Sequence, residues 1–134
     1  MLAGLTNSSP DCGDAFMSRD PVTLSATFTN IGSLDTHRVS IDWGNGVVTT
    51  GTVVESGGNG TVRGSYVYPT GGIFTITVTL TDDDGGVSRL QTVAVVGGVG
   101  LNNGQLQVIG TDRRDVIHVS STTGGTILKV VASF

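Results

Sequence analysis

Cysteine, glutamate and clustered basic residues are scarce in this chain of 134 residues. Cys12 is the only cysteine, so no disulfide can form within the chain. We expect a free thiol there, and a link to another chain is the alternative. Glu55 is the only glutamate among 11 acidic residues. Because glutamate mostly serves helix surfaces, its near absence predicts a chain without helices.

Long apolar runs and basic patches are also missing. The seven lysines and arginines are scattered and the net charge is −4, which argues against nucleic acid and anionic membranes as partners. No apolar run approaches the roughly 18 to 20 residues of a membrane-spanning helix, so we expect no membrane insertion. Residues 1–6 have no basic start and no sustained apolar stretch, unlike a signal peptide. If the protein works outside the cell, we expect this chain to be part of a longer precursor.

Sequence motifs of catalysis are absent as well. His37 and His118 lie on separate strand patterns without metal-ligand spacing, and we expect both to be exposed. We find no nucleophile elbow, phosphate-binding loop or pair of catalytic carboxylates. The sequence therefore predicts that the chain is not an enzyme.

Alternating apolar and polar residues dominate what is present. Val22, Leu24, Ala26 and Phe28 alternate with threonines and serine, which is typical of a half-buried strand. Similar patterns predict strands, with turn residues between them, near 37–43, 47–54, 61–68, 73–81, 87–96, 105–109, 116–120 and 126–131. Gly51 weakens the strand at 47–54 and is a candidate bulge.

These patterns predict an all-β protein with about seven strands in two antiparallel sheets. We expect residues 1–20 to form a lead-in linker, residues 21–97 the sandwich, and residues 98–134 a short C-terminal β segment. The glycine-rich stretch at 97–100 is the expected boundary.

Trp43 is the predicted centre of the core. It shares one strand face with Val39 and Ile41, which places its ring between the two sheets. An exposed tryptophan that stacks on a ligand is the alternative. The strongest later strand adds further apolar residues on a single face. The predicted core is Phe28, Val39, Ile41, Trp43, Phe74, Ile76 and Val78.

Residues 39–46 and 66–86 together resemble the signature of the PKD (polycystic-kidney-disease-type) domain. The first segment reads Val-Ser-Ile-Asp-Trp-Gly-Asn-Gly, and the second carries Tyr-Val-Tyr, two glycines, a threonine-rich strand and an acidic turn. The chain departs from the family pattern because Asp42 precedes Trp43 and because Asn45 stands where aspartate is usual. The resemblance implies an immunoglobulin-like β-sandwich of an extracellular or cell-surface protein.

Two functions follow from this resemblance. The first is a non-catalytic module of a larger secreted or cell-surface bacterial protein, which serves as a spacer, in adhesion or in protein–protein contact, beside neighbouring modules of the same polypeptide. The alternative is an accessory module of a secreted hydrolase that binds a polysaccharide or a protein. Tyr66, Tyr68 and Phe74 are the aromatic residues that such a module would present.

The resemblance also implies a calcium site. In some PKD-type domains, an Asn-Ser pair before the first strand and aspartates after it bind Ca²⁺; the matching positions here are Asn7, Ser8, Asn30 and Asp35. The acidic run at 82–84 is a second place where carboxylates gather. A solvated turn without metal is the alternative.

Residues 110–117 resemble one copy of the glycine- and aspartate-rich nonapeptide that binds Ca²⁺ in parallel β-rolls. Arg113 stands where a second glycine is expected, and only one copy is present, although stacking needs about three. We therefore expect a degenerate or truncated β-repeat segment that does not bind metal.

Overall fold

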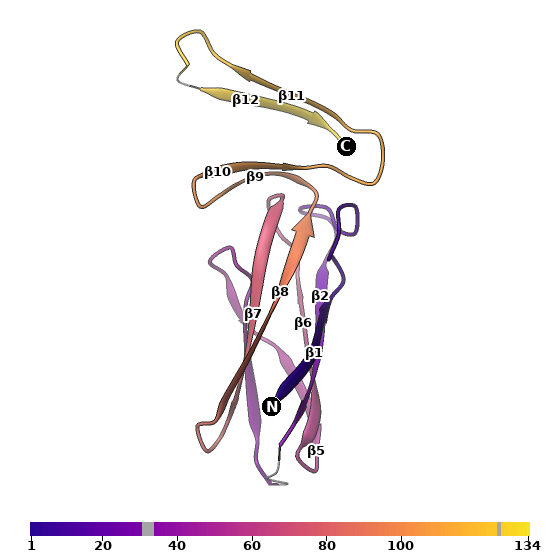
Figure 1. The fold of residues 1–134 in the computed structure, drawn as a ribbon, viewed down its shortest axis with the longest axis vertical. Coiled ribbons are helices and arrows are strands. Elements are labelled where there is room, and N and C mark those ends of the chain that lie inside the picture. Colours follow the sequence, from indigo (N-terminus) through magenta and orange to yellow (C-terminus); the bar gives the residue numbers. More distant parts are fainter. Residues whose placement is uncertain (31–33, 126) are drawn as a thin grey trace.

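The computed structural model describes residues 1–30, 34–125 and 127–134. Within these ranges the chain is all β, with twelve strands and no helix. Eight strands form an antiparallel immunoglobulin-like sandwich, and two hairpins follow at one end (Figure 1). The predicted fold class is confirmed, whereas the predicted number of strands is too low.

The first sheet has the order β1-β2-β6-β5. Its strands are Leu2–Asn7 (β1), Val22–Thr29 (β2), Asn59–Tyr66 (β6) and Thr52–Ser56 (β5). The second sheet has the order β4-β3-β7-β8. Its strands are Val48–Thr50 (β4), His37–Asp42 (β3), Gly72–Asp82 (β7) and Val87–Val96 (β8).

Strand β1 lies in the segment that the sequence predicts to be a linker. It pairs with β2, and its Leu2 side chain is buried against the core. A bulge shifts the register between Ala3 and Thr6, so the alternation on which strand prediction depends is broken. The first residues of the chain are therefore part of the sandwich.

The predicted strand at 47–54 is two strands that belong to different sheets. The chain leaves β4 and enters β5 at Gly51, whose N–H donates to the Val39 carbonyl at 3.3 Å. A Cβ atom at Gly51 would lie 2.8 Å from the Arg63 carbonyl oxygen and from the side chains of Ile41 and Val39. Glycine is required here because the chain crosses between the sheets with no room for a side chain.

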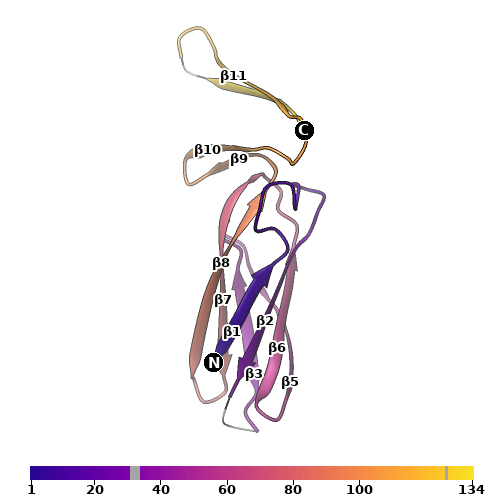
Figure 2. The same cartoon turned by 45° about the vertical axis from the view of Figure 1, so that its right-hand side comes forward.

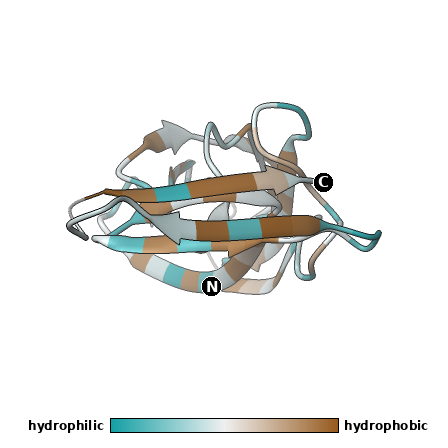
Figure 3. Ribbon diagram, turned by 90° about the horizontal axis from the view of Figure 1, so that it is seen from above, coloured by the Kyte–Doolittle hydropathy of each residue, from teal (hydrophilic) through white to brown (hydrophobic). Residues whose placement is uncertain are grey.

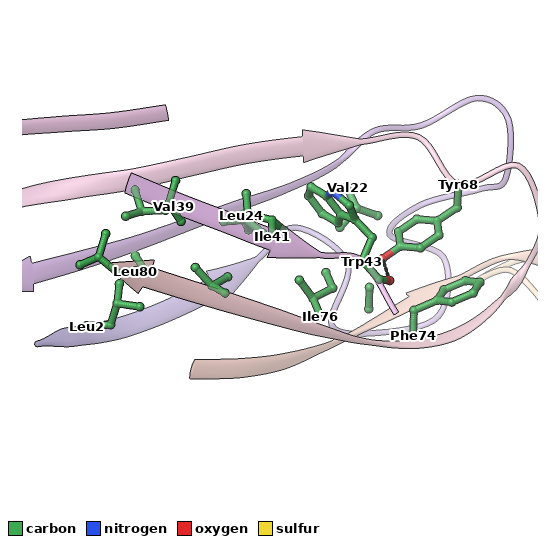
Figure 4. Close-up of a cluster of buried hydrophobic side chains, with 14 of the residues drawn as sticks. Leu2, Val22, Leu24, Val39, Ile41, Trp43, Tyr68, Phe74, Ile76 and Leu80 are labelled. Carbon is green, nitrogen blue, oxygen red and sulfur yellow. Dashed lines mark hydrogen bonds between the residues drawn. The ribbon is translucent and has the colours of Figure 1, made fainter. Parts of the chain in front are cut away.

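The core lies between the two sheets around Trp43, and all seven predicted core residues are buried (Figure 4). Trp43 is fully buried, and its indole N–H donates to Thr49 Oγ1 at 2.9 Å. Tyr66 stacks on the indole with the ring centroids 5.3 Å apart. Tyr68 donates its hydroxyl to the Trp43 carbonyl at 2.7 Å, and its own ring stacks on Phe74. These aromatic contacts link the two sheets in a chain whose single cysteine allows no internal disulfide.

Beyond β8 the chain forms two separate hairpins. They consist of β9 (Gly98–Asn102) with β10 (Gln105–Ile109), and of β11 (Val116–Ser121) with β12 (Leu128–Ser133). In Figures 1 and 2 the first hairpin lies across the end of the sandwich and the second lies beyond it. Figure 3, viewed from this end, shows hydrophobic segments along the outer hairpin, and many of its apolar side chains are exposed.

Candidate functional site

A cluster of hydrogen-bonded polar side chains lies at the end of the sandwich opposite the hairpins. We call Asn30, Asp35, His37, Glu55 and Asp82 the polar pole. The pole is formed where β2 leads to β3, where β5 turns into β6, and where β7 turns into β8. A cavity of about 350 Å³ opens beside it and is lined by Met1, Asn30, His37, Leu80, Asp82, Gly86, Val87 and Ser88.

His37 lies at the centre of this pole, and its side chain is less exposed than the sequence predicts. The sequence predicts an exposed histidine, but only 4% of its side chain is accessible. Its Nδ1 donates to Glu55 Oε2 at 2.6 Å, and its backbone N–H donates to Glu55 Oε1 at 3.3 Å. The ring also lies 4.5 Å from that of Phe28. The prediction is wrong because β5, from the other sheet, brings a carboxylate against β3.

Asn30 and Asp35 are the two predicted calcium ligands that the structure brings together. Asn30 Nδ2 donates to Asp35 Oδ2 at 2.7 Å and lies 3.4 Å from His37 Nε2. The amide therefore presents its nitrogen, and not its oxygen, to the carboxylate. An oxygen-ligated cation between these two side chains would require the amide to turn over.

Asn7 and Ser8, the other two predicted ligands, lie elsewhere. Asn7 Nδ2 donates to Thr92 Oγ1 at 2.8 Å and to the Val93 carbonyl at 3.0 Å, and so joins β1 to β8. Ser8 Oγ accepts the Thr23 N–H at the start of β2, whereas Asn30 follows the end of that strand. An eight-residue strand is roughly 25 Å long. The four residues therefore do not form one calcium site.

The acidic run at 82–84 acts locally as a set of turn caps. Asp82 Oδ1 accepts the Gly86 N–H at 2.6 Å, and Asp83 Oδ1 accepts the Thr36 N–H at 3.2 Å. These bonds close the β7–β8 turn and attach it to the segment before β3. Across residues 1–30, 34–125 and 127–134, no three His, Cys, Asp or Glu side chains are grouped in a way that could hold a metal ion.

The aromatic residues expected to present a ligand-binding surface lie largely inside. Tyr68 and Phe74 are buried, and Tyr66 is half-buried against Trp43. Burial raises the pKa of the Tyr68 hydroxyl well above its ordinary value, and the nearby Tyr66 and Asp42 act in the same direction. These three rings therefore do not form an exposed platform.

The segment that resembles a β-roll repeat makes its own polar contacts. Asp115 accepts hydrogen bonds from the backbone N–H and the hydroxyl of Thr111, at 2.7 and 2.8 Å. The carboxylate thereby caps the turn that precedes β11. His118, the second histidine, is exposed on β11.

One exposed ion pair lies near the hairpin end. Arg19 hydrogen-bonds Asp20, with the closest atoms 3.0 Å apart, and this contact lowers the pKa of the Asp20 carboxyl and raises that of Arg19. The same guanidinium lies 5.2 Å above the centre of the Phe16 ring. Cys12, in the same lead-in, is exposed.

No family model and no curated protein matches this chain. A search of the described residues for helices long and apolar enough to cross a membrane finds none.

Several contacts of these polar residues were not predicted from the sequence. The Glu55–His37 pair joins residues 18 positions apart, and Asn7 reaches a strand 85 positions further on. Nothing in the local pattern around these residues indicates their partners. The resemblance signalled that Asn30 and Asp35 belong together, and the acidic run at 82–84 signalled that polar groups gather in a turn.

Proposed function

We propose that this chain is a non-catalytic, PKD-like module of a larger secreted or cell-surface bacterial protein, in which it acts as a spacer between neighbouring modules. The observation that carries this proposal is the path of the chain. Residue 1 lies toward the polar pole, and residue 134 lies beyond the opposite end of the sandwich (Figure 1). Modules joined in this way follow one another end to end.

The use of the polar groups supports a structural role. Both ring nitrogens of His37 face protein partners, Glu55 and Asn30, and the acidic run caps turns. A general base needs a nitrogen or carboxylate that can reach a substrate proton. The contact between His37 and Glu55 instead joins the two sheets, and the acidic run closes a turn.

Small-angle X-ray scattering tests the spacer role. We expect the single chain to be elongated and a tandem fusion of two copies to have a maximum dimension close to twice that of one copy. A tandem fusion that is compact, with its copies side by side, would contradict the proposal.

Calcium binding is a separate part of the proposal, and its candidate ligands are Asn30 and Asp35 at the polar pole. Asn30 and Asp35 are adjacent, whereas Asn7 and Ser8 lie at the other end of β2. We expect millimolar Ca²⁺ to raise the melting temperature by a few degrees, as ligand binding to the folded state does. Asp35→Asn should abolish this shift and Ser8→Ala should leave it unchanged. If the native chain shows no shift in melting temperature and no heat on calorimetric titration, it does not bind calcium.

The alternative role as an aromatic-platform binding module has less support. Its candidate residues are Tyr66, Tyr68 and Phe74, and none of them forms an exposed flat pair. Any polysaccharide contact therefore has to use another surface of the sandwich.

A further inference from the structure

We propose that the outer face of the first sheet binds carboxylated polysaccharides, with Arg63 holding the carboxylate. We call Thr6, Thr23, Ser25, Arg63 and Ser65 the Arg63 face. The inference rests on the proposed role as a non-catalytic surface module and adds a ligand class to it.

The face is a row of side chains across three strands. Thr6 of β1 pairs with Ser25 of β2, and Ser25 pairs with Arg63 of β6. Paired residues of neighbouring strands project from the same face of a sheet. The next row along β2 adds Thr23 opposite Ser65. All five side chains are exposed.

The bulge in β1 is what completes this row. Leu2 points into the core, so in a regular strand Thr6 would point inward as well. The extra residue between Ala3 and Thr6 reverses the alternation, so that Leu5 packs against the core and Thr6 lies outside beside Ser25. Bulges commonly redirect side chains at binding sites.

The same region holds an open depression of about 540 Å³. It is lined by Thr6, Asn7, Ser8, Thr23, Leu24, Ser25, Arg63 and Gly64. Ser8 Oγ accepts the Thr23 N–H at 2.9 Å, which leaves its hydroxyl hydrogen able to donate outward. Four of the eight lining residues carry hydroxyl groups. The Thr6 hydroxyl donates to the Ser25 carbonyl at 3.4 Å, and the hydroxyls of Ser8, Thr23 and Ser25 can donate to a sugar.

The charged side chains of the first sheet indicate which class of ligand its outer face would bind. The four strands of this sheet carry two charged side chains, Glu55 and Arg63, and Glu55 is bonded to His37. Among the residues that the structure describes, no carboxylate forms an ion pair with Arg63. A guanidinium binds carboxylates through paired N–H donors. The outer face of this sheet is therefore cationic, although the whole chain has a net charge of −4.

The shape of the surface favours a polysaccharide over a peptide. An extended peptide usually binds the open edge of a sheet, where backbone groups are available. The Arg63 face instead presents side-chain hydroxyls from the broad outer surface of β1, β2 and β6. A chain of uronic acid residues supplies both the carboxylate and the hydroxyl groups that match it.

Titration with a galacturonic acid oligomer, followed by the backbone amide signals in NMR, tests this proposal. We expect shifts to concentrate at Thr6, Ser25 and Arg63. Arg63→Gln should weaken binding about three- to fivefold, as expected for the loss of one exposed charged contact. Arg89→Gln, which removes an exposed arginine from the other sheet, is the matched control and should leave the affinity unchanged.

Several outcomes would overturn the proposal. These are an absence of shifts on this face up to millimolar ligand, equal binding by Arg63→Gln, and equal binding of an uncharged galactose oligomer. A glutamate oligomer that binds this face as tightly would assign it to acidic peptides instead. The scattering experiment tests the spacer role independently, so a failure here leaves that result unchanged.

Discussion

At the scale of single residues, the aromatic contacts around Trp43 hold the two sheets together. The indole is fully buried, donates to Thr49, and contacts the rings of Tyr66 and Tyr68. Gly64 makes room for this packing, because a Cβ atom there would lie 2.3 Å from Ile41 Cδ1. Gly64 thus leaves space for Ile41 beside the indole, inside a sandwich that has no disulfide.

We predict that Trp43→Ala lowers the free energy of unfolding by about 3 to 5 kcal/mol, because it leaves a cavity in the core. Thr49→Val should cost about 1 to 3 kcal/mol, since it keeps the ring but leaves the buried indole N–H without its partner. Urea denaturation followed by circular dichroism measures both, because Trp43 is the only tryptophan and fluorescence would be lost with it. A small loss for Trp43→Ala would mean that the ring does not support the core.

The buried hydroxyl of Tyr68 should make the stability of the protein depend on pH in the alkaline range. Burial raises the pKa of its hydroxyl in the folded state above the ordinary value of about 10. The neutral hydroxyl therefore contributes stability fully below pH of about 10, and this contribution is lost as the pH rises further.

We expect the native chain to lose stability above that pH more steeply than Tyr68→Phe does. Denaturant midpoints at a series of pH values measure the difference, and tyrosinate absorbance shows whether ionisation accompanies unfolding. At neutral pH the same substitution should cost about 1 to 3 kcal/mol, because the Trp43 carbonyl loses its partner. Parallel pH profiles for the two proteins would contradict the assignment.

At the scale of elements, β1 closes one side of the sandwich. It pairs with β2 in the first sheet, while Asn7 and Ser9 hydrogen-bond the edge of β8 in the second. On the other side, the crossing at Gly51 carries the chain directly from β4 to β5. On both sides of the sandwich the edge strands of the two sheets are thereby connected to each other. These connections protect strand edges that could otherwise pair with another chain.

Substitutions at two adjacent residues test the role of β1. Leu2→Asp should destabilise the protein by about 2 kcal/mol or more, because it buries an unpaired charge in the core. Ala3→Asp, on the exposed face of the same strand, should change stability by no more than about 0.5 kcal/mol. Chemical denaturation distinguishes this strand from a linker, for which both variants would be neutral.

At the scale of the whole molecule, we expect the sandwich and the outer hairpin to open with different free energies. The sandwich surrounds one core, whereas β11 and β12, in the part of the chain that the structure describes, pair only with each other. They expose apolar side chains such as Val116 and Leu128, and the Phe134 ring that follows β12 contacts Phe16 with the centroids 5.2 Å apart. An isolated two-stranded hairpin is at best marginally stable in water.

Hydrogen exchange should therefore divide the molecule into two parts. We expect amides of β11 and β12 to open with a free energy of about 1 kcal/mol or less, and those of β7 to exchange only through global unfolding. Mass spectrometry of peptides from both regions gives the comparison. Equal protection of the hairpin and of β7 would show that the outer hairpin belongs to the same cooperative unit.

The sequence by itself determined the all-β class, most of the strands and the core around Trp43. These follow from an alternation of apolar and polar residues that each strand carries locally, as in Val22–Thr29 and Gly72–Asp82. Only the tertiary structure decided that Leu2–Asn7 is a strand, that the chain changes sheet at Gly51, and that His37 is buried against Glu55. It also separated Asn7 from Asn30. The physical reason is that each of these depends on partners distant in the chain or on the space between sheets, which a local pattern does not encode.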